Sequence, residues 1–579
     1  MTIIEDKNFS RAEQAAREQI TDFVRAVVGK TSTVTVDYPP EPALGHFTVP
    51  CFTLGKALGE PPAVVAGRIA AAVMPKTATL IARAQAAGPY VNFFVQPDAY
   101  AALTLPQIVK EGAAYGSANI GKGKTILVEY FSPNTNKPMT VGHVRNVCLG
   151  WSLSRLLSAL GFTVVENSIY NDRGIALCKA TVAYRRWGNG ATPETAGMKP
   201  DHFVGQFYVR FGQEVEAHPE LEQEAQECLR QWEAGDPEVR RIWRQLIDWT
   251  MDGFTETLQR MGVDHPAVRY FESEIYRHGK EVVEDGLARG VFRRHSEGYI
   301  YAPLEDEGLP EKILLRSDGT SLYITQDLYL AQLKGKHDPA LSIYVVGAEQ
   351  DLAFRQLFAI MQELGQTYPM HHLSYGMMRL PTGKIKSRQG IPAGAGADDL
   401  LSLLDELAVE EVRARHQKLP AVAVRERAHA IALAALKYYI LSVNATTTMM
   451  FDPEKSLAFA GRTGPYLQYV HARCCSLLEK AGKTRKTKPT FTEPLEQALL
   501  VTLARFPHAV QRAATVYDPS VVSAYLYELA QTFSSFYQDV PVLQSKGATL
   551  SSRLQLVFAV KTVMARGLSL LGIPAPDAM

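Results

Sequence analysis

The sequence lacks the features that mark membrane proteins and disulfide-rich secreted proteins. No run of about 18 apolar residues occurs, so we expect no membrane-spanning helix. The start, residues 1–13, is polar and does not show the basic and then apolar layout of a signal peptide. The six cysteines show no C-x-x-C spacing, which argues against a zinc site and favours reduced thiols. Together these absences predict a cytoplasmic protein without membrane attachment.

The chain also has almost no net charge. Its 61 basic and 60 acidic residues leave a formal charge of +1. Any nucleic acid must therefore bind to a local patch and not to the protein as a polycation. One basic patch, at 480–488, lies before Pro489. A solvated loop explains this patch as well as nucleic-acid contact does.

Length and patterning divide the chain into three parts, because 579 residues are too many for one hydrophobic core. Residues 1–115 are typical of a small α/β unit, residues 116–400 alternate strands with helices, and residues 401–579 are almost wholly helical. The first part should contain a helix at 11–28 and strands at 33–36 and 90–94. The second should contain a helical insertion at about 185–265, and further strands at 313–316, 321–325, 342–347 and 373–378.

A strand–helix–strand unit begins the second part. The apolar run 126–131 leads into a polar turn. A helix is expected to begin near Pro138, with apolar residues at three- and four-residue steps from Val141 to Leu160. The next strand is expected at 162–169. Such a unit implies an α/β fold with a parallel, doubly wound sheet. Ligands of such sheets bind outside the carboxyl ends of the strands, which is where residues 132–143 would lie.

The start of this helix is suited to nucleotide phosphate. Unpaired amides and the positive end of the helix dipole point toward a ligand there. Gly142 and His143 occupy the first turns, and His143 could meet the charge that builds on a transferring phosphoryl group. Taken alone, a Gly-His pair fits equally well a capped helix with His143 on the surface.

Five motifs together resemble the arginyl version of the class I aminoacyl-tRNA synthetases. Residues 132–146, S-P-N-T-N-K-P-M-T-V-G-H-V-R-N, resemble the HIGH signature of this family, and 383–390, G-K-I-K-S-R-Q-G, resemble its KMSKS loop. Residues 316–327 resemble the S-D-G-T-x-x-Y-x-x-x-D block, 347–351 the G-A-x-Q block, and 464–473 the G-P-Y-x-Q-Y-x-H-A-R signature. The resemblance covers most of the chain. It implies an N-terminal add-on domain, a Rossmann catalytic domain and a helical anticodon-binding domain.

The resemblance implies a two-step ligation. ATP, with Mg²⁺ on its phosphates, would activate L-arginine to arginyl-adenylate, and the arginyl group would pass to the 3′ end of tRNA(Arg). In this subgroup the activation step requires tRNA. No side-chain nucleophile is needed, because positioning and charge stabilisation carry the rate. We expect the protein to act as a monomer.

The resemblance also assigns residues to the ATP site. The groups implied in catalysis are mostly cationic and are His143, Lys137, Lys384, Lys386 and Arg388. The groups implied in ATP binding are Thr140, Gly142, His143, Lys384 and Ser387. Mobile cations in the second motif would meet the β- and γ-phosphates as pyrophosphate leaves.

The amino-acid pocket must recognise a guanidinium, which is planar, carries five donors and never loses its charge. A selective pocket therefore offers carboxylates and amide or phenol oxygens. The resemblance places Glu129, Asn134, Tyr323, Asp327 and Gln350 there. Without it, Tyr323 would be interpreted as a core aromatic and Asp327 as a helix cap. If a helix starts at Tyr323, both side chains lie on one face.

Contacts with tRNA are expected in the outer parts of the chain. The nominated residues are Asn92 in the first part and Tyr469, Arg473 and Met579 in the third. Tyr469 and Arg473 would suit stacking and edge contacts to splayed bases, although packing explains a helical Tyr and Arg as well. Asp172, in an N-D-x-G segment, either binds ribose and orients the pocket or simply forms a turn.

Departures from the family pattern leave two alternatives open. Thr140 stands where a His is usual and cannot carry positive charge, whereas Lys386 stands where Ser is usual and adds a cation. These changes admit a paralogue with weakened or lost catalysis that acts in tRNA binding. A cysteinyl or glutamyl class I enzyme would instead require a zinc ligand set or a cationic pocket, and the nominated pocket is acidic.

Overall fold

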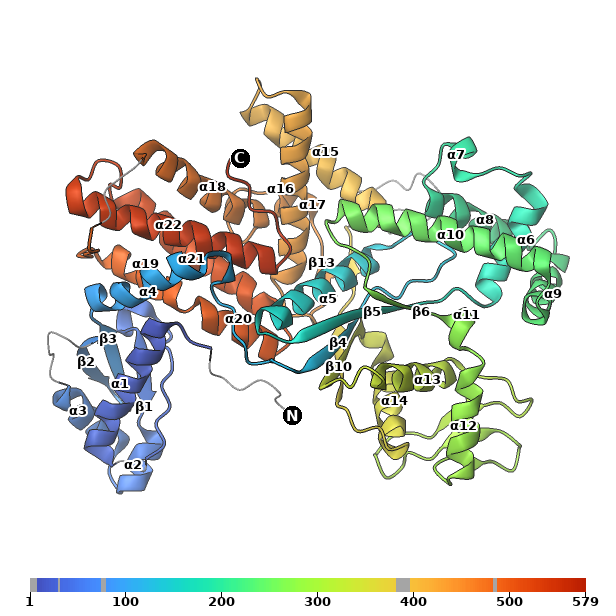
Figure 1. Cartoon of the computed structure of the whole chain (residues 1–579), viewed down its shortest axis with the longest axis horizontal. Coiled ribbons are helices and arrows are strands. Elements are labelled where there is room, and N and C mark those ends of the chain that lie inside the picture. The colour runs from blue at the N-terminus through green and yellow to red at the C-terminus, as the bar shows by residue number, and fades with distance from the viewer. Residues whose placement is uncertain (1–7, 30–31, 74–79, 382–395, 483–486) are drawn as a thin grey trace. The chain divides into compact units, whose positions relative to one another are not determined.

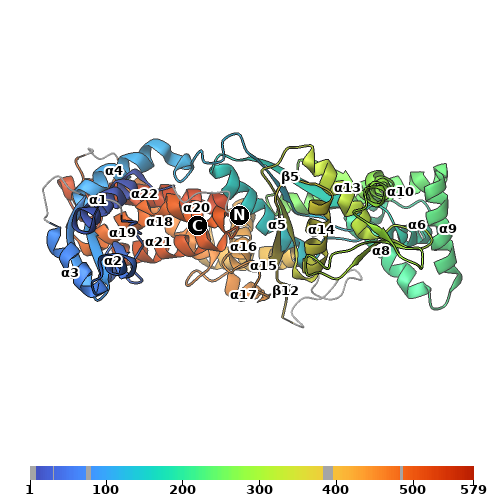
Figure 2. The same cartoon turned by 90° about the horizontal axis from the view of Figure 1, so that it is seen from below.

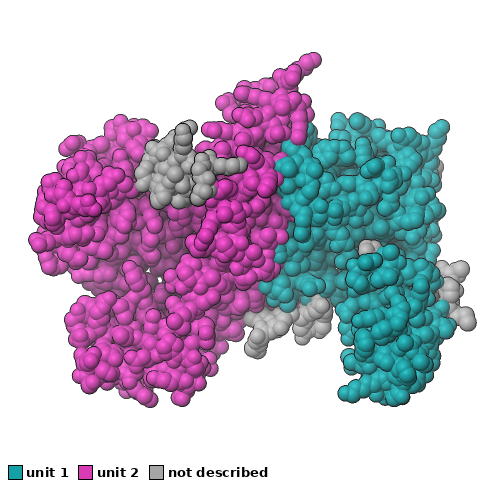
Figure 3. Space-filling model, turned by 180° about the vertical axis from the view of Figure 1, so that it is seen from behind, with its two compact units in different colours: residues 1–118, 458–516, 520–579 teal, residues 119–457, 517–519 magenta. Residues whose placement is uncertain are grey.

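The computed structural model describes residues 8–29, 32–73, 80–381, 396–482 and 487–579. The chain forms two compact units, which are coloured separately in Figure 3. Unit 1 contains residues 1–118, 458–516 and 520–579, and unit 2 contains residues 119–457 and 517–519. None of the helices in the described ranges is long and apolar enough to cross a membrane.

Unit 1 joins a small α/β part to a helical bundle. The elements of its α/β part are α1 (Arg11–Val28), β1 (Phe47–Pro50), α2 (Phe52–Leu58), α3 (Pro62–Ala72), β2 (Ile81–Ala87), β3 (Tyr90–Val95) and α4 (Pro97–Glu111). The helices of its bundle are α18 (Gly464–Ala481), α19 (Pro494–Ala504), α20 (Phe506–Thr515), α21 (Ser520–Asp539) and α22 (Gly547–Leu570). Strands β1, β3 and β2 form an antiparallel sheet in that order. Figure 2 shows α4 beside the helices of the bundle.

The sequence predicts the helix and one of the two strands of this α/β part. The helix at 11–28 is confirmed as α1, and Ser10 caps it by accepting a hydrogen bond from the backbone N–H of Glu13 (3.2 Å). The strand at 90–94 is confirmed as β3. The prediction of a strand at 33–36 is wrong. A guanidinium N–H of Arg17 on α1 donates a hydrogen bond to the carbonyl of Val36 in place of a neighbouring strand.

Unit 2 is built around a parallel sheet. Its strands are β4 (Thr125–Glu129), β5 (Thr163–Tyr170), β6 (Val268–Phe271), β7 (Arg293–Arg294), β8 (Ile300–Ala302), β9 (Lys312–Leu315), β10 (Leu341–Gly347), β11 (Met370–Tyr375), β12 (Met378–Arg379) and β13 (Met449–Met450). Its helices are α5 (Val141–Ala159), α6 (Ile175–Trp187), α7 (Pro193–Ala196), α8 (Pro200–Glu214), α9 (Glu220–Ala234), α10 (Pro237–Arg260), α11 (Glu272–Ile275), α12 (His278–Ala288), α13 (Tyr323–Gly335), α14 (Asp351–Glu363), α15 (Ala397–Arg415), α16 (Ala421–Leu441) and α17 (Pro453–Ser456).

The central sheet confirms the predicted α/β class and doubly wound sheet. Its strand order is β11-β10-β4-β5-β6, and every neighbouring pair is parallel (Figure 1). The chain leaves β4 toward β5 on one side and later returns to β10 on the other. This reversal makes the crevice at the carboxyl ends of β4 and β10 the topological switch point, where doubly wound sheets bind ligands.

Two features of unit 2 differ from the expected layout. The strand expected at 321–325 is wrong, because only Ser321 bridges back to Leu315 and α13 begins at Tyr323. The boundary expected at residue 400 also differs from the division of the structure, since α15, α16 and α17 belong to the unit of the sheet. These helices stay there because β13 pairs with β12. The insertion expected at about 185–265 corresponds to α7 to α10, whose buried aromatic and aliphatic side chains form a core with α6.

Helix α5 packs on the turn after β4 through Gly150. A Cβ atom at this position would lie 2.3 Å from the ring of Tyr130, which is closer than packed atoms approach. We therefore predict that Gly150→Ala lowers the free energy of unfolding by about 1–3 kcal/mol. Gly212→Ala is the control, because no heavy atom lies within 4 Å of the added methyl group on α8. Chemical denaturation measures both variants, and equal stabilities would contradict this packing.

Candidate active site

The chain turns sharply where it leaves the central strand β4. Phe131 is fully buried and has a positive φ of 59°, a conformation that costs free energy for a residue with a bulky side chain. The side chain of Asn146 on α5 holds this turn, because its Oδ1 accepts the N–H of Phe131 (2.6 Å) and its Nδ2 donates to the carbonyl of Val345 (2.6 Å). One amide thus fixes the ends of β4 and β10 together at the switch point.

His143 lies in the first turn of α5 and is neutral. Its Nδ1 accepts the backbone N–H of Thr140 (3.0 Å), which leaves the proton of the ring on Nε2. Burial and then the charge of Lys137 lower the pKa of His143 to about 4. At neutral pH the ring therefore offers one N–H donor beside the free amides at the start of α5. Such a donor can meet phosphate oxygen as a hydrogen-bond partner, although not as a cation.

Gly142 precedes His143, and the protein itself does not require a glycine there. Among the described residues, a Cβ atom at this position would meet only Oγ1 of Thr140, at an ordinary distance of 3.6 Å, and the backbone φ is not positive. The absent side chain therefore leaves space between the described atoms at the start of the helix. This space is what a close-lying nucleotide would need.

Arg145, two residues further along α5, is fully buried and anchors the neighbouring segments. Its guanidinium donates to the carbonyls of Gly376 (2.6 Å), Met377 (3.2 Å), Ala445 (2.9 Å) and Thr447 (2.8 Å). Desolvation lowers the pKa of Arg145, but carbonyl oxygens surround the charge. This side chain ties the helix of His143 to the segment after β11 and to the segment before β13.

The predicted cationic loop lies outside the described residues. Lys384, Lys386, Ser387 and Arg388 all belong to residues 382–395. The residues that follow this loop lie at the start of α5. Gly396 forms an isolated bridge with Thr140, and the N–H of Ala397 donates to the carbonyl of Met139 (2.9 Å).

Acidic side chains gather at the carboxyl end of β4. Glu129 is buried and forms an ion pair with Lys334 of α13, which is fully buried and lies 3.9 Å from the ring centre of Tyr344. Asp327 belongs to the same helix and is open to solvent, yet its pKa is raised to about 7. The largest cause is desolvation by the surrounding protein, and the charge of Glu129 is the next. Glu272 adds to the same effect, so the acids outweigh the one buried cation that faces them.

The other three predicted pocket residues lie on open surface. Tyr323 is 79% exposed at the start of α13, one helical turn before Asp327. Asn134 is exposed and accepts a hydrogen bond from Asn171 (3.0 Å), and Gln350 is exposed in the turn between β10 and α14. Among the described contacts, the structure therefore brings Glu129 and Asp327 together but does not join the other three to them.

Sequence reasoning missed three side chains of this acidic cluster. Lys334, Glu272 and Gln326 belong to it, with Gln326 donating to Glu272 (3.1 Å). Lys334 follows Asp327 by seven residues, so helical periodicity would have placed it on the same face. Asp172 is buried and accepts two hydrogen bonds from Ser273, at 2.8 Å and 2.6 Å. Asp172 therefore orients the start of α11, the helix that carries Glu272. The interpretation of Asp172 as a residue that only forms a turn is incomplete.

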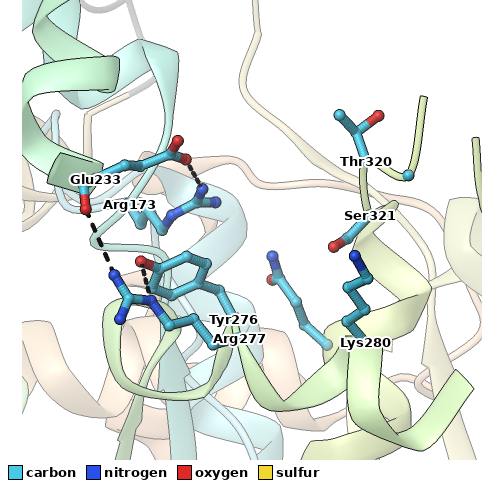
Figure 4. A pocket seen from close by; sticks show the side chains of 9 residues that line it. Arg173, Glu233, Tyr276, Arg277, Lys280, Thr320 and Ser321 are labelled. Atoms are coloured by element: carbon cyan, nitrogen blue, oxygen red, sulfur yellow. Dashed lines mark hydrogen bonds and ion pairs between the residues drawn. The ribbon is translucent and has the colours of Figure 1, made fainter. Parts of the chain in front are cut away.

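A cationic pocket adjoins the acidic cluster through Gln326. Its volume is about 510 Å³, and it is lined by Arg173, Glu233, Tyr276, Arg277, Lys280, Gly319, Thr320, Ser321 and Gln326. Figure 4 shows Arg173 paired with Glu233 on one side and Lys280 beside Ser321 on the other. Arg277 donates to the hydroxyl of Tyr276 (2.7 Å) and makes no ion pair among the described residues. Two cations of this pocket thus face solvent and suit an anion.

The residues predicted to contact tRNA differ in their surroundings. Asn92 is buried in β3, where its amide oxygen accepts a hydrogen bond from Thr48 (2.7 Å), and its contact with tRNA stays a prediction. On α18, the guanidinium of Arg473 lies between the rings of Tyr469 (4.3 Å) and Tyr537 (4.4 Å). These side chains are half-buried and form an aromatic and cationic stack at the surface of the bundle.

Comparisons with known proteins agree with this geometry. The family model described as "tRNA synthetases class I (R), catalytic domain" matches residues 104–453. A "DALR anticodon binding domain" matches residues 467–579, and an "Arginyl tRNA synthetase N terminal domain" matches residues 14–95. The doubly wound sheet, the helix start with His143 and these matches define a class I aminoacyl-tRNA synthetase.

Relatives narrow the class to one family. The arginine–tRNA ligase of Treponema pallidum is 40% identical over 94% of this chain and 95% of its own length, and that of Treponema denticola is 39% identical over the same shares. The arginyl-tRNA synthetase of Thermus thermophilus superposes with a TM-score of 0.78 at 25% identity, covering 97% of this chain and 99% of its own. The chain belongs to the arginyl-tRNA synthetases, which are arginine–tRNA ligases. Nothing in these comparisons supports the alternative of a paralogue without catalysis.

The buried guanidinium of Arg145 should be required for stability. We predict that Arg145→Lys, which keeps the charge but has fewer donors, lowers the free energy of unfolding by about 1–3 kcal/mol for each carbonyl left without a partner. Arg155→Lys is the control, since Arg155 lies exposed on the same helix over the ring of Trp151. Urea denaturation compares the two variants. Equal losses would show that the four carbonyl contacts do not matter.

Proposed function

We propose that this chain activates L-arginine at the carboxyl ends of β4 and β10 and transfers the arginyl group to the 3′ end of tRNA(Arg). The observation that carries this assignment is the acidic cluster beside the start of α5. Glu129 and Asp327 meet there, and Lys334 compensates only part of their charge. Desolvation and then the charge of Glu129 raise the pKa of Asp327, and an added cation such as the guanidinium of arginine would favour its ionised form.

The same residues suggest how the substrate is held. Asp327 accepts N–H groups of the guanidinium in a charge-assisted bond, while Glu129 contributes charge from the end of β4 and is itself held by Lys334. Tyr323, Asn134 and Gln350 line the open sides of the arginine and supply oxygens. These assignments follow the family pattern, and the exposure of the three side chains leaves them available.

ATP occupies the start of α5 in this proposal. The free amides of the first turn and the Nε2–H of His143 face its phosphates, and Gly142 and Thr140 allow the close approach of the backbone. Lys137 and the loop residues Lys384, Lys386, Ser387 and Arg388 supply cations. Mg²⁺ arrives on the ATP as part of the substrate. Of the two groups of described side chains that could hold a metal, one is compensated by Lys199 and Arg260, and the other belongs to the bundle of unit 1.

The reaction proceeds in two balanced steps. A carboxylate oxygen of arginine attacks the α-phosphorus of ATP, an O–P bond forms, and the bond to pyrophosphate breaks. A hydroxyl oxygen of the terminal ribose of tRNA then attacks the acyl carbon and forms an ester bond. The bond from the acyl carbon to the phosphate oxygen breaks, AMP leaves, and the proton of the hydroxyl passes to solvent. Hydrogen-bond donors that are already in place stabilise the charge of both transition states, so no covalent enzyme intermediate is required.

The tRNA would meet both units. The pocket with Arg277 and Lys280 suits the phosphates of the acceptor strand, because it adjoins the acidic cluster and carries the opposite charge. The stack of Tyr469 and Arg473 and the C-terminal Met579 suit unpaired anticodon bases. The α/β part within residues 1–115 provides a further surface for tRNA. We place the protein in the cytoplasm as a monomer.

The assignment is tested by pyrophosphate exchange. We predict exchange that depends on arginine and requires tRNA(Arg), because activation in this family subgroup requires the tRNA. Exchange with a different amino acid would overturn the substrate assignment. Absence of exchange with arginine, both with and without tRNA, would favour a tRNA-binding paralogue.

Asp327 should control arginine binding and its pH dependence. A bound guanidinium favours the carboxylate, so binding at pH 7 should release up to about half a proton from a group whose pKa in the free protein is about 7. Affinity for arginine should therefore fall as the pH drops below 7, approaching tenfold per pH unit. Titration calorimetry in buffers of different ionisation enthalpy measures the released proton.

Two variants separate this effect from general damage. We predict that Asp327→Asn costs about 1.5–3 kcal/mol in arginine binding and abolishes the proton release. Asp338→Asn, in an exposed turn after the same helix, should leave both unchanged. An unchanged KM for arginine in Asp327→Asn would contradict the assignment of Asp327 to the arginine pocket.

Gly142 should be required for ATP and not for folding. The methyl group of Gly142→Ala meets no protein atom closer than 3.6 Å, so thermal stability should stay unchanged. The KM for ATP should rise at least about tenfold, with the KM for arginine unaffected, because the methyl group occupies space that the phosphates need. Gly212→Ala is again the control. A normal KM for ATP in Gly142→Ala would contradict the proposal that ATP binds at the start of α5.

A further inference from the structure

A cluster of three metal-ligating side chains lies in the bundle of unit 1, where the end of the chain runs along α18 (Figure 1). Three hydrogen bonds hold this tail. Gln468 donates to the carbonyl of Pro574 (2.8 Å), His471 to the carbonyl of Pro576 (3.0 Å), and the thiol of Cys475 to Oδ1 of Asp577 (3.1 Å). The three helix residues are spaced by three and four positions, so they lie on one face of α18.

The hydrogen bond of His471 fixes the tautomer of its ring. A carbonyl oxygen can only accept, so Nδ1 carries the proton and Nε2 keeps its lone pair. Nδ1 and Nε2 lie 3.9 Å and 4.0 Å from Sγ of Cys475. A neutral imidazole whose other nitrogen donates to a backbone carbonyl is the usual arrangement of a histidine that binds metal.

We propose that Nε2 of His471, Sγ of Cys475 and a carboxylate oxygen of Asp577 bind Zn²⁺, or another divalent metal that accepts nitrogen, sulfur and oxygen ligands, with water in the fourth position. The ligand atoms of the three residues lie within 4.8 Å of one another. Tetrahedral zinc, with bonds of about 2.0–2.3 Å, requires such atoms to be roughly 3.3–3.7 Å apart. A separation of 4.8 Å would therefore have to close by about 1.1–1.5 Å, a movement that two side chains can share.

Metal binding is chemically balanced without any further reactant. The thiol of Cys475 loses its proton to solvent as the metal–sulfur bond forms, whereas His471 is already neutral. Oδ1 of Asp577 accepts the thiol of Cys475 and lies 3.5 Å from Nζ of Lys561, which is the geometry of a carboxylate acceptor. One proton is thus released for each metal ion bound.

Lys561 of α22 opposes the metal. Its Nζ lies 3.5 Å from the same Oδ1 of Asp577 that accepts the thiol. The metal must compete with this ammonium for the carboxylate, so removal of the charge should tighten metal binding. This competition separates a genuine site at Asp577 from metal that binds elsewhere on the chain.

A metal at this place would link α18 to the last residues of the chain. Asp577 comes two residues before Met579, and α18 also carries Tyr469 and Arg473. Metal occupancy would therefore fix the C-terminal residues beside the aromatic stack. This consequence for tRNA rests on the proposed function, but the binding of metal itself does not.

The test is titration of the full-length protein with Co²⁺, which replaces Zn²⁺ and gives a thiolate-to-metal charge-transfer band. We expect a band with one equivalent of Co²⁺, its displacement by Zn²⁺, and its loss in Cys475→Ser. Asp577→Asn should weaken binding at least about tenfold, and Lys561→Gln should strengthen it. Cys474→Ala is the control, because that neighbouring thiol is fully buried and should leave the band unchanged.

Three outcomes would overturn the proposal. They are no band at a large excess of Co²⁺, a band that persists in Cys475→Ser, and binding that does not tighten in Lys561→Gln. The variants of Cys475, Asp577 and Lys561 alter partly exposed side chains and avoid the buried His471, so folding should survive. Because the readout is spectroscopic, failure of this site is distinguishable from failure of the ligase assignment.

Discussion

Two consecutive side chains of α5, Arg145 and Asn146, determine the geometry on which the rest of the site depends. Asn146 joins the ends of β4 and β10 and stabilises the left-handed Phe131. The guanidinium of Arg145 donates four hydrogen bonds, from Nη1 and Nη2, to carbonyls of two later segments. The start of α5, with His143, is thereby held against the ends of two strands and against two later segments. Rigid positioning of this kind is what a ligase without a nucleophile requires.

The charges of unit 2 are divided between two neighbouring regions. Acids dominate at the end of β4, and cations dominate in the pocket beside it, with Gln326 between them. A cationic amino acid and an anionic strand would be attracted to different sides of the same boundary. Such a division favours correct placement of both substrates through charge alone, because each region repels the substrate of the other.

Much of this architecture could be predicted from the sequence. The helix at 11–28, the strand–helix–strand unit and the acidic residues Glu129 and Asp327 follow from periodicity and from motifs that span most of the chain. The errors arose where tertiary contacts override local preference. Residues 321–325 contain strand-forming types, yet α13 starts among them. The domain boundary expected at 400 stays a prediction, and the structure groups α15, α16 and α17 with the sheet.

Other features had no signal in a single sequence. The ion pair of Glu129 and Lys334 joins residues 205 positions apart. The hydrogen bonds of Arg145 reach up to 302 positions, and only the folded chain reveals them. The sequence pattern predicts that Cys474 and Cys475 both pack as small apolar residues. Cys474 is buried, whereas the thiol of Cys475 donates to the carboxylate of Asp577, near the end of the chain.

Unit 1 is assembled from the beginning and the end of the chain, and this has a consequence for synthesis on the ribosome. Tyr115 stacks on Phe506 and donates to the carbonyl of Leu503, and Asn8 donates to the carbonyl of Pro507. The residues of unit 2 lie between these partners in the sequence, so they emerge before the bundle and can complete their own core. The earliest translated segment must therefore remain without its bundle until the last hundred or so residues leave the exit tunnel.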